Sequence, residues 1–221
     1  MLFYLIAAYL TALLHHKAPV PTYQAPNISP VMLERVKKET VLISVEGWGG
    51  VGRGTGVLID SRHVLTCAHM VADGVTMIYT YPMRRVITAH PVFGDRGHDL
   101  AIFELDEPVE LRHYAVFNTT TTVGQPIVVV GNTLGCMKWF VSYGIVAEKD
   151  FFFLLTTALI KGGNSGGPWV NLNGEIVAIT DWGLQHNGKD DGIAGGVDAE
   201  AIQAFIHTWQ HPPMFMFSFG G

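Results

Sequence analysis

The sequence predicts an all-β protein made of two small β-barrels packed together. Short runs rich in β-branched and aromatic residues alternate with turns that contain glycine and aspartate over most of the 221-residue chain. These runs form two groups of about six, separated by residues 107–123, where strong apolar runs are few. With 48% hydrophobic and 15% charged residues, the composition argues against disorder. Strand groups of this size are typical of small barrels.

The first 30 residues contain two segments that precede the predicted barrels. Residues 2–14 are almost entirely apolar. This run is shorter than the ~20 residues that a membrane span needs, but it suits the apolar region of a signal peptide. We expect residues 1–18 to be a signal or a membrane anchor, with possible membrane association through residues 2–14; the alternative is a buried N-terminal helix. Four prolines in residues 19–30 predict an extended linker.

The folded domain is expected to cover residues 31–210. It begins with a short helical pattern over residues 31–38. Barrel 1 is expected over about 39–110 and barrel 2 over about 123–197. The expected strands are 40–45, 55–59, 64–66, 75–81, 86–93 and 100–105 in barrel 1, and 126–130, 139–146, 151–157, 169–170, 175–180 and 193–197 in barrel 2.

A C-terminal helix is predicted after the second barrel, over residues 198–209. Asp198 is a suitable N-cap residue. Ile202, Phe205, Ile206 and Trp209 follow at helical spacing. The remaining residues, 211–221, form a hydrophobic tail that either packs on the body or is disordered.

Several classes of function are disfavoured by composition and motifs. The formal net charge of −5 gives no electrostatic footprint for nucleic acid. The glycines at 52, 54 and 56 lead into a strand rather than a helix, which disfavours a dinucleotide site. There is no His-Glu-x-x-His motif and no Cys/His pair at zinc spacing, so we expect no metal and no cofactor. Cys67 and Cys136 could form one bridge or remain reduced.

One stretch, residues 161–168, has a composition suited to catalysis. It reads Lys-Gly-Gly-Asn-Ser-Gly-Gly-Pro and lies between two apolar, β-rich runs. Glycines allow successive N–H groups to point into one small space. Amide hydrolysis needs such donors beside an attacking hydroxyl, here that of Ser165. The alternative is a glycine-rich hairpin turn with an incidental serine.

An activated serine also needs a base and a group that orients the base. His69 follows an expected strand in a stretch of small residues, from which its ring could face a cleft. Asp99 stands directly before an apolar strand, where partial burial would require a partner. The alternatives are a half-buried structural histidine and a solvated turn aspartate.

Taken together, these stretches resemble a known family. Thr-Cys-Ala-His at 66–69, Asp-Leu-Ala-Ile at 99–102 and Gly-Asn-Ser-Gly-Gly-Pro at 163–168 occur in this order. They are similar to the three motifs of the trypsin-like (chymotrypsin-fold) serine proteases, and most similar to the HtrA/Deg-like branch. The resemblance covers about residues 31–206. It implies two six-stranded antiparallel barrels with the active site between them.

The resemblance also implies a role for each motif residue. Ser165 would be the nucleophile, His69 the general base and then acid, and Asp99 the residue that orients His69. The backbone N–H groups of Gly163 and Ser165 would form the oxyanion hole, with Asn164 between them. Turnover is then expected to fall as the pH drops through the range in which histidine becomes protonated.

Two departures from relatives have consequences. Digestive-type relatives carry an acid immediately before the serine, which pairs with a new N-terminal amine after zymogen cleavage. Asn164 occupies that position here, so we expect activity that needs no freshly cut N-terminus. Few residues follow the predicted C-terminal helix, so we expect no PDZ domain of the kind that many HtrA-like proteases carry. Cys67, next to the histidine motif, could tune access or be oxidised, or simply be a small buried side chain.

The resemblance locates the primary specificity pocket in two segments. These are Leu159-Ile160-Lys161 before the serine loop and Thr180-Asp181-Trp182 after it. Leu159 and Ile160 stand at the expected pocket base, so we expect cleavage after small or medium apolar residues of protein or peptide substrates. An inward-facing Asp181 would instead favour arginine or lysine.

The leading prediction is an exported or membrane-associated serine endopeptidase. A second possibility is a viral or phage protease of the same fold that processes a polyprotein or structural protein. A third, of a different class, is a catalytically silent binding module on a protease fold. The oligomeric state is not predicted.

Overall fold

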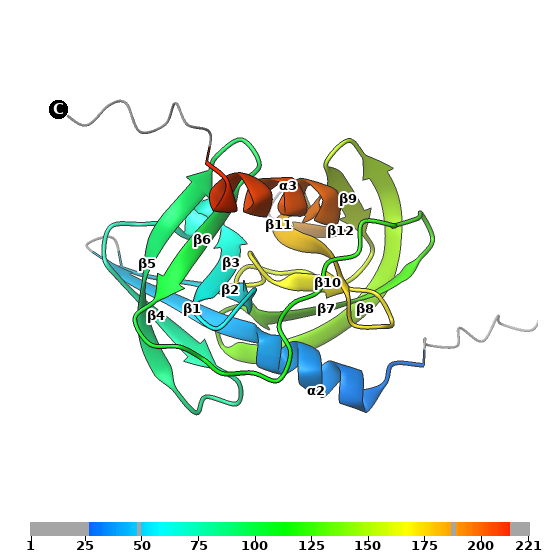
Figure 1. Cartoon of the computed structure of the whole chain (residues 1–221). Coiled ribbons are helices and arrows are strands. Elements are labelled where there is room, and N and C mark those ends of the chain that lie inside the picture. The colour runs from blue at the N-terminus through cyan, green and yellow to red at the C-terminus, as the bar shows by residue number, and fades with distance from the viewer. Residues whose placement is uncertain (1–26, 48–49, 187–188, 213–221) are drawn as a thin grey trace, which may run out of the picture.

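The computed structural model describes residues 27–47, 50–186 and 189–212 and contains two closed β-barrels (Figure 1). Barrel 1 closes in the order β1-β2-β3-β6-β5-β4, and barrel 2 in the order β10-β11-β12-β9-β8-β7. All pairs of neighbouring strands within the barrels are antiparallel. The predicted fold class, two six-stranded antiparallel barrels with a C-terminal helix, is therefore confirmed.

Each of the twelve expected runs lies in or overlaps a strand. The strands are β1 (Thr40–Gly47), β2 (Gly50–Leu58), β3 (His63–Cys67), β4 (Val75–Thr80), β5 (Val86–Asp95), β6 (Leu100–Leu105), β7 (Pro126–Thr133), β8 (Met137–Asp150), β9 (Phe153–Thr156), β10 (Pro168–Val170), β11 (Ile176–His186) and β12 (Lys189–Asp198). β2 begins five residues earlier than expected, because its exposed, glycine-rich first half pairs with β1 through backbone hydrogen bonds.

Two helices pack against the barrels. Helix α2 (Pro30–Glu39) starts at Ser29, whose side chain accepts a hydrogen bond from the Met32 N–H, and it leads directly into β1. Helix α3 (Ala199–Gln210) is capped by Asp198, whose carboxylate accepts from the Ala201 N–H at 2.9 Å. In Figure 1, α3 crosses above both barrels and α2 lies on the opposite side.

The buried apolar residues form three clusters. One fills barrel 1 and another fills barrel 2, where Trp169 is the largest fully buried side chain. The third lies between the barrels and includes residues of both, with Val36 of α2 and Ile202 and Phe205 of α3. The helices thus help to fix one barrel against the other, because their apolar faces share this cluster.

The expected signal or anchor segment, residues 1–18, lies outside the described residues, as do most of the expected linker and tail. Among the residues that the structure does describe, no helix is long and apolar enough to cross a membrane.

Candidate active site

His69 and Asp99 are brought together by two neighbouring strands of barrel 1. His69 lies in the short 3-10 helix η1 (Ala68–Met70), directly after β3. Asp99 lies directly before β6, and the β3–β6 register pairs Cys67 with Leu100. The end of β3 and the start of β6 therefore coincide. The Ala68 N–H donates to the Asp99 carbonyl at 2.9 Å and closes this corner.

The Asp99 carboxylate binds His69 at two points. One oxygen accepts a hydrogen bond from the His69 backbone N–H at 2.8 Å, and the other lies 2.5 Å from the ring Nδ1. A carboxylate accepts only, so a neutral ring in this contact carries its proton on Nδ1 and leaves Nε2 free to accept a proton. About 46% of the His69 side chain is exposed, which keeps the ring accessible.

Asp99 has a left-handed backbone conformation, with φ of +51°. Aspartate is one of the residues that tolerates this region, although it is sparsely populated. Residues held in such conformations are found preferentially at functional sites. The conformation here accompanies the double contact between Asp99 and His69.

The glycine loop that carries Ser165 connects β9 to β10 and is held by backbone hydrogen bonds. The N–H groups of Asn164, Gly166 and Gly167 donate to the carbonyls of Lys161, Thr180 and Asn164, at 3.1, 2.8 and 2.8 Å. Within the described residues, no acceptor is found for the N–H of Gly163 or for that of Ser165. These are the two groups proposed from the sequence as the oxyanion hole.

The direction of these two free N–H groups follows from the carbonyls before them. The Gly162 carbonyl accepts from the Leu134 N–H at 2.5 Å, and the Asn164 carbonyl accepts from the Gly167 N–H. In a planar trans peptide the C=O and N–H point in opposite directions. Fixing these two carbonyls therefore turns the N–H groups of Gly163 and Ser165 away from the loop's own contacts. Two donors remain available for an anion.

Strand β2 of barrel 1 holds this loop of barrel 2 in place. The Thr55 N–H donates to the Ser165 carbonyl at 2.8 Å, and the Thr55 hydroxyl donates to the Gly163 carbonyl at 2.7 Å. A Cβ added to Gly166 would collide with the Thr55 carbonyl and the Thr66 hydroxyl. The serine loop thus rests on the pair β2 and β3, and His69 follows the end of β3. The segments that carry the three predicted triad residues therefore lie at the junction of the barrels.

The side chain of Asn164, directly before Ser165, is held by a hydrogen bond between neutral groups. Asn164 is 1% exposed, and its amide oxygen accepts a hydrogen bond from the Thr133 hydroxyl at 2.8 Å. Both partners are neutral, so this buried contact involves no ion pair. The loop conformation is therefore supported from β7, within barrel 2.

The six residues predicted to line the specificity pocket have different surroundings. Ile160 is 6% exposed and belongs to the core of barrel 2. Thr180 is fully buried; its hydroxyl accepts from the Trp169 indole at 2.9 Å, and its carbonyl accepts from the Cys67 thiol at 3.0 Å. Lys161 is half-buried. Leu159 and Trp182 are 47% and 39% exposed, so their apolar side chains can meet a substrate.

Asp181 turns towards His69 and Asp99. Ligand-type atoms of Cys67, His69, Asp99 and Asp181 all lie within 4.8 Å of one another. Burial, followed by a hydrogen bond to Asp99 and the charge of Asp99, raises the pKa of Asp181 to about 7, while His69 opposes this shift. Burial, assisted by the charge of Asp99, also raises the pKa of the Cys67 thiol well above its usual range. Cys67 is therefore a neutral donor to Thr180.

Three of these four side chains already have hydrogen-bond partners within the protein: the Asp99 carboxylate contacts His69, and the Cys67 thiol donates to the Thr180 carbonyl. The two cysteines are not bridged. Cys67 is buried and Cys136 is exposed, and both are free thiols.

Two cavities differ in their relation to this site. One of about 410 Å³ adjoins the serine loop and is lined by Val51, Arg53, Leu134, Gly135, Gly162 and Gly163. Arg53 donates to the Gly135 carbonyl at 3.0 Å across this cavity wall. Arg53 and Leu134 were not predicted from the sequence as residues near the site. Their position beside the serine loop depends on how the β7–β8 turn folds over that loop. The glycines of β2 and of the turn were the only local signal.

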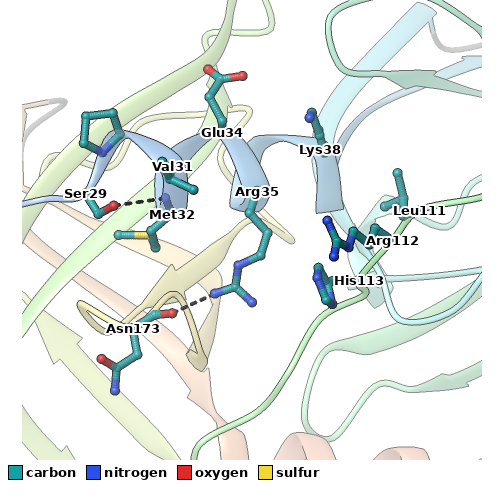
Figure 2. Close-up of a pocket in the computed structure, with 11 residues that line it drawn as sticks. Ser29, Val31, Met32, Glu34, Arg35, Lys38, Leu111, Arg112, His113 and Asn173 are labelled. Atoms are coloured by element: carbon teal, nitrogen blue, oxygen red, sulfur yellow. Dashed lines mark hydrogen bonds between the residues drawn. The ribbon is translucent and has the colours of Figure 1, made fainter.

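A larger cavity, of about 910 Å³, lies away from the predicted triad. It is lined by residues of α2, of the segment 107–123 between the two barrels, and of the β10–β11 turn. Figure 2 shows the Arg35 guanidinium directed at the Asn173 carbonyl, with Arg112 and His113 on the opposite wall. None of the predicted site residues lines it, so its size does not make it the active site.

Comparisons with known proteins agree with this geometry. A family model described as a trypsin-like peptidase domain matches residues 54–179. The periplasmic serine endoprotease DegP of Escherichia coli is 29% identical over 161 residues, which cover 68% of this chain and 34% of that protein. The periplasmic pH-dependent serine endoprotease DegQ of Escherichia coli is 28% identical over 205 residues, which cover 76% of this chain and 45% of that protein.

A probable periplasmic DegP-like serine endoprotease of Brucella suis is 28% identical over 168 residues, which cover 71% of this chain and 32% of that protein. The chain thus spans between about a third and a half of the length of these relatives. The structure of the HtrA-type protease AlgW with a tripeptide superimposes with a TM-score of 0.73 at 19% identity, covering 81% of this chain and 62% of that one. That likeness is one of fold. Because the family model covers more than half of the sequence, the chain belongs to the family of trypsin-like peptidase domains.

Proposed function

We propose that this chain is a serine endopeptidase that works through Ser165, His69 and Asp99. The Ser165 hydroxyl attacks the substrate carbonyl carbon, and its proton passes to His69 Nε2. The carbonyl oxygen becomes an anion that accepts hydrogen bonds from the N–H groups of Gly163 and Ser165. His69 then returns the proton to the leaving amine as the C–N bond breaks. Water, deprotonated by His69, hydrolyses the resulting acyl ester and releases Ser165.

The observation that carries this proposal is the pair of free N–H groups in the serine loop. Buried or half-buried backbone donors are nearly always paired. Here the donors at positions 164, 166 and 167 are paired, while those of Gly163 and Ser165 have no acceptor among the described residues. Two unpaired donors in the loop of a serine, at the barrel junction where a carboxylate also holds a histidine, support acyl transfer. A silent binding module would not need this arrangement.

Labelling with a fluorophosphonate probe tests the proposal directly. The wild type should form a covalent adduct on Ser165, and Ser165→Ala should form none. His69→Ala should also react far more slowly, since loss of a triad member costs several powers of ten in turnover. A folded wild-type protein that is not labelled would favour the silent binding module instead.

We further propose cleavage after small or medium apolar residues. The exposed side chains of Leu159 and Trp182 support an apolar surface for the substrate. The Asp181 carboxyl, which could have favoured a cationic residue, lies beside His69 and Asp99. A peptide library should therefore be cut after apolar residues; a profile dominated by arginine or lysine would contradict this.

Activity should also be independent of a newly cut N-terminus. The neutral contact between Asn164 and Thr133 supports this, because it gives the loop an internal anchor. An uncleavable N-terminal fusion should react with the probe as fast as the unfused chain. A wholly unreactive fusion would refute the idea.

Export is proposed from residues 1–18 together with the relatives, whose names describe them as periplasmic. A signal peptide would be absent from the mature protein, and a membrane anchor would be retained. N-terminal sequencing of the fractionated native protein distinguishes the two. Recovery of the full-length chain in the cytoplasm would contradict both.

A further inference from the structure

Asp181 is a carboxyl group at the centre of the site for which the proposed mechanism has no role. It lies in β11, where the register with β12 pairs Thr180 with Gly196 and Trp182 with Gly195. Asp181 therefore sits in a β-bulge, with no partner of its own in the ladder. Bulges turn a side chain away from the direction that the regular strand would give it. Here the bulge directs the carboxyl towards Cys67, His69 and Asp99.

Asp99 can accept a further hydrogen bond, and Asp181 is the neighbour that can donate it. Asp99 already accepts from the His69 backbone at 2.8 Å and contacts the His69 ring at 2.5 Å. A carboxylate has about four acceptor positions, so at least one more donor can be accommodated. The Cys67 thiol donates to the Thr180 carbonyl at 3.0 Å and also interacts with Asp99, since burial and then the Asp99 charge raise the pKa of the thiol. The remaining titratable neighbour of Asp99 in this cluster is Asp181.

If both were ionised, the Asp99 and Asp181 carboxylates, which have oxygens within 4.8 Å of each other, would repel in this half-buried site. One proton held between them removes the repulsion and creates a hydrogen bond. The direction of the Asp181 pKa, raised by burial and by Asp99, agrees with a proton on Asp181. Asp99, which contacts both the backbone and the ring of His69, then remains the acceptor.

We propose that Asp181 is a positioning residue: as a neutral carboxylic acid it donates a hydrogen bond to Asp99 and thereby holds Asp99 against His69. This inference rests on the proposed function, because it assigns a role within the same site. It also predicts a pH dependence. On the acid side, protonated His69 cannot act as a base. On the alkaline side, Asp181 loses its proton and Asp99 loses a donor, so the rate should fall at both ends.

Two variants of Asp181 distinguish a hydrogen bond donated to Asp99 from a role of the side chain in packing alone. Asp181→Asn keeps a neutral N–H donor of the same shape at every pH. It should react with a fluorophosphonate probe within about threefold of the wild type at pH 7 and show no decline up to pH 9. Asp181→Ala has no donor and should react about tenfold more slowly, or worse, since a hydrogen bond to a charged group is worth roughly that factor or more. Probe affinity should not change in either.

The comparison of these profiles decides the inference. It is supported if the wild type declines at alkaline pH, Asp181→Asn does not, and Asp181→Ala is slow throughout. It is overturned if Asp181→Ala matches the wild type in rate and pH profile, or if Asp181→Asn shows the same alkaline decline. Circular dichroism of each variant checks that the fold is retained.

A second measurement does not depend on activity. In the Ser165→Ala background, the proton between His69 Nδ1 and Asp99 should give a downfield proton NMR signal. Replacing Asp181 by alanine should shift this signal or broaden it by faster exchange, whereas asparagine should preserve it. An unchanged signal in the alanine variant would refute the positioning role. If the wild type failed to react with the probe, the proposed function would fail, and this measurement would still decide the role of Asp181.

Discussion

Replacing Thr55 by valine should slow the reaction of Ser165 with a fluorophosphonate probe, although the hydrogen bonds of the Thr55 side chain go to Gly163 and Asn132 and not to the predicted triad. The Thr55 hydroxyl donates to the Gly163 carbonyl at 2.7 Å and accepts from the backbone and side-chain N–H groups of Asn132 at 2.9 and 3.1 Å. Valine has nearly the same shape but makes none of these bonds. The Gly163 carbonyl and the Asn132 backbone N–H then lose their partners, while the Asn132 side chain keeps a bond to Val41.

The size of the effect follows from burial. Thr55 and Asn132 are fully buried, so water cannot easily replace the lost hydroxyl. An unsatisfied buried polar group costs about 1–3 kcal/mol, which gives a loss of roughly 2–6 kcal/mol in the free energy of unfolding for the two groups. The serine loop also loses the hydrogen bond from the Thr55 hydroxyl to the Gly163 carbonyl, which lies between the two proposed oxyanion donors in the chain. We expect the labelling rate to fall by about tenfold or more, but by less than the roughly 10²–10³ that removal of a whole oxyanion donor costs.

The matched control is Thr55→Ser, which keeps the hydroxyl and loses only a methyl group. It should cost about 1 kcal/mol of stability and leave the labelling rate within about threefold of the wild type. Urea unfolding gives the stability, and time courses of probe labelling give the rate. If the valine variant reacts as fast as the serine variant and is equally stable, Thr55 does not support the loop and the reasoning is wrong.

Two further predictions concern the loop and the pH dependence of stability. Gly166→Ala should abolish labelling or folding, because φ of Gly166 is +82° and the added Cβ would meet the Thr55 carbonyl and the Thr66 hydroxyl. The control is Gly162→Ala, which has open space around it and should behave like the wild type. Equal tolerance of both substitutions would contradict this prediction. Burial raises the pKa of Glu39 from 4.5 to about 7. The unfolded state therefore ionises first as the pH rises, and stability should fall by up to roughly 3 kcal/mol between pH 4.5 and 8. Glu39→Gln should remove this decline in urea unfolding, and an equal decline in both proteins would exclude Glu39 as its source.

The fold was predictable because its signals are local. β-Branched runs ended by glycine and aspartate turns marked the strands, and Asp198 with apolar residues at helical spacing marked α3. The first half of β2 was missed because its pairing with β1 comes from the backbone, and its exposed glycines leave no apolar pattern. Strand pairing that depends on a neighbour cannot be predicted from the residues of one strand alone.

The candidate site was predictable only where a motif marks it. His69, Asp99 and Ser165 stand in recognisable stretches, and the structure brings their segments to one junction. The support for these segments comes from residues without a motif, such as Thr55 and Thr133. Their hydroxyls act across distances of 108 and 31 residues along the chain. Such contacts arise only once the barrels are packed together.

Asp181 shows why one shift of register changes the expected role of a residue. In a regular strand, successive side chains face opposite sides, and a bulge inserts a residue that breaks this alternation. The interpretation from sequence grouped Asp181 with Thr180 and Trp182 at the specificity pocket. With Thr180 and Trp182 paired to the adjacent residues Gly196 and Gly195, Asp181 is the inserted residue, and its carboxyl joins Asp99 instead. The proposed apolar specificity and the proposed alkaline limit of activity are therefore linked, since both follow from the bulge that turns Asp181 towards Asp99.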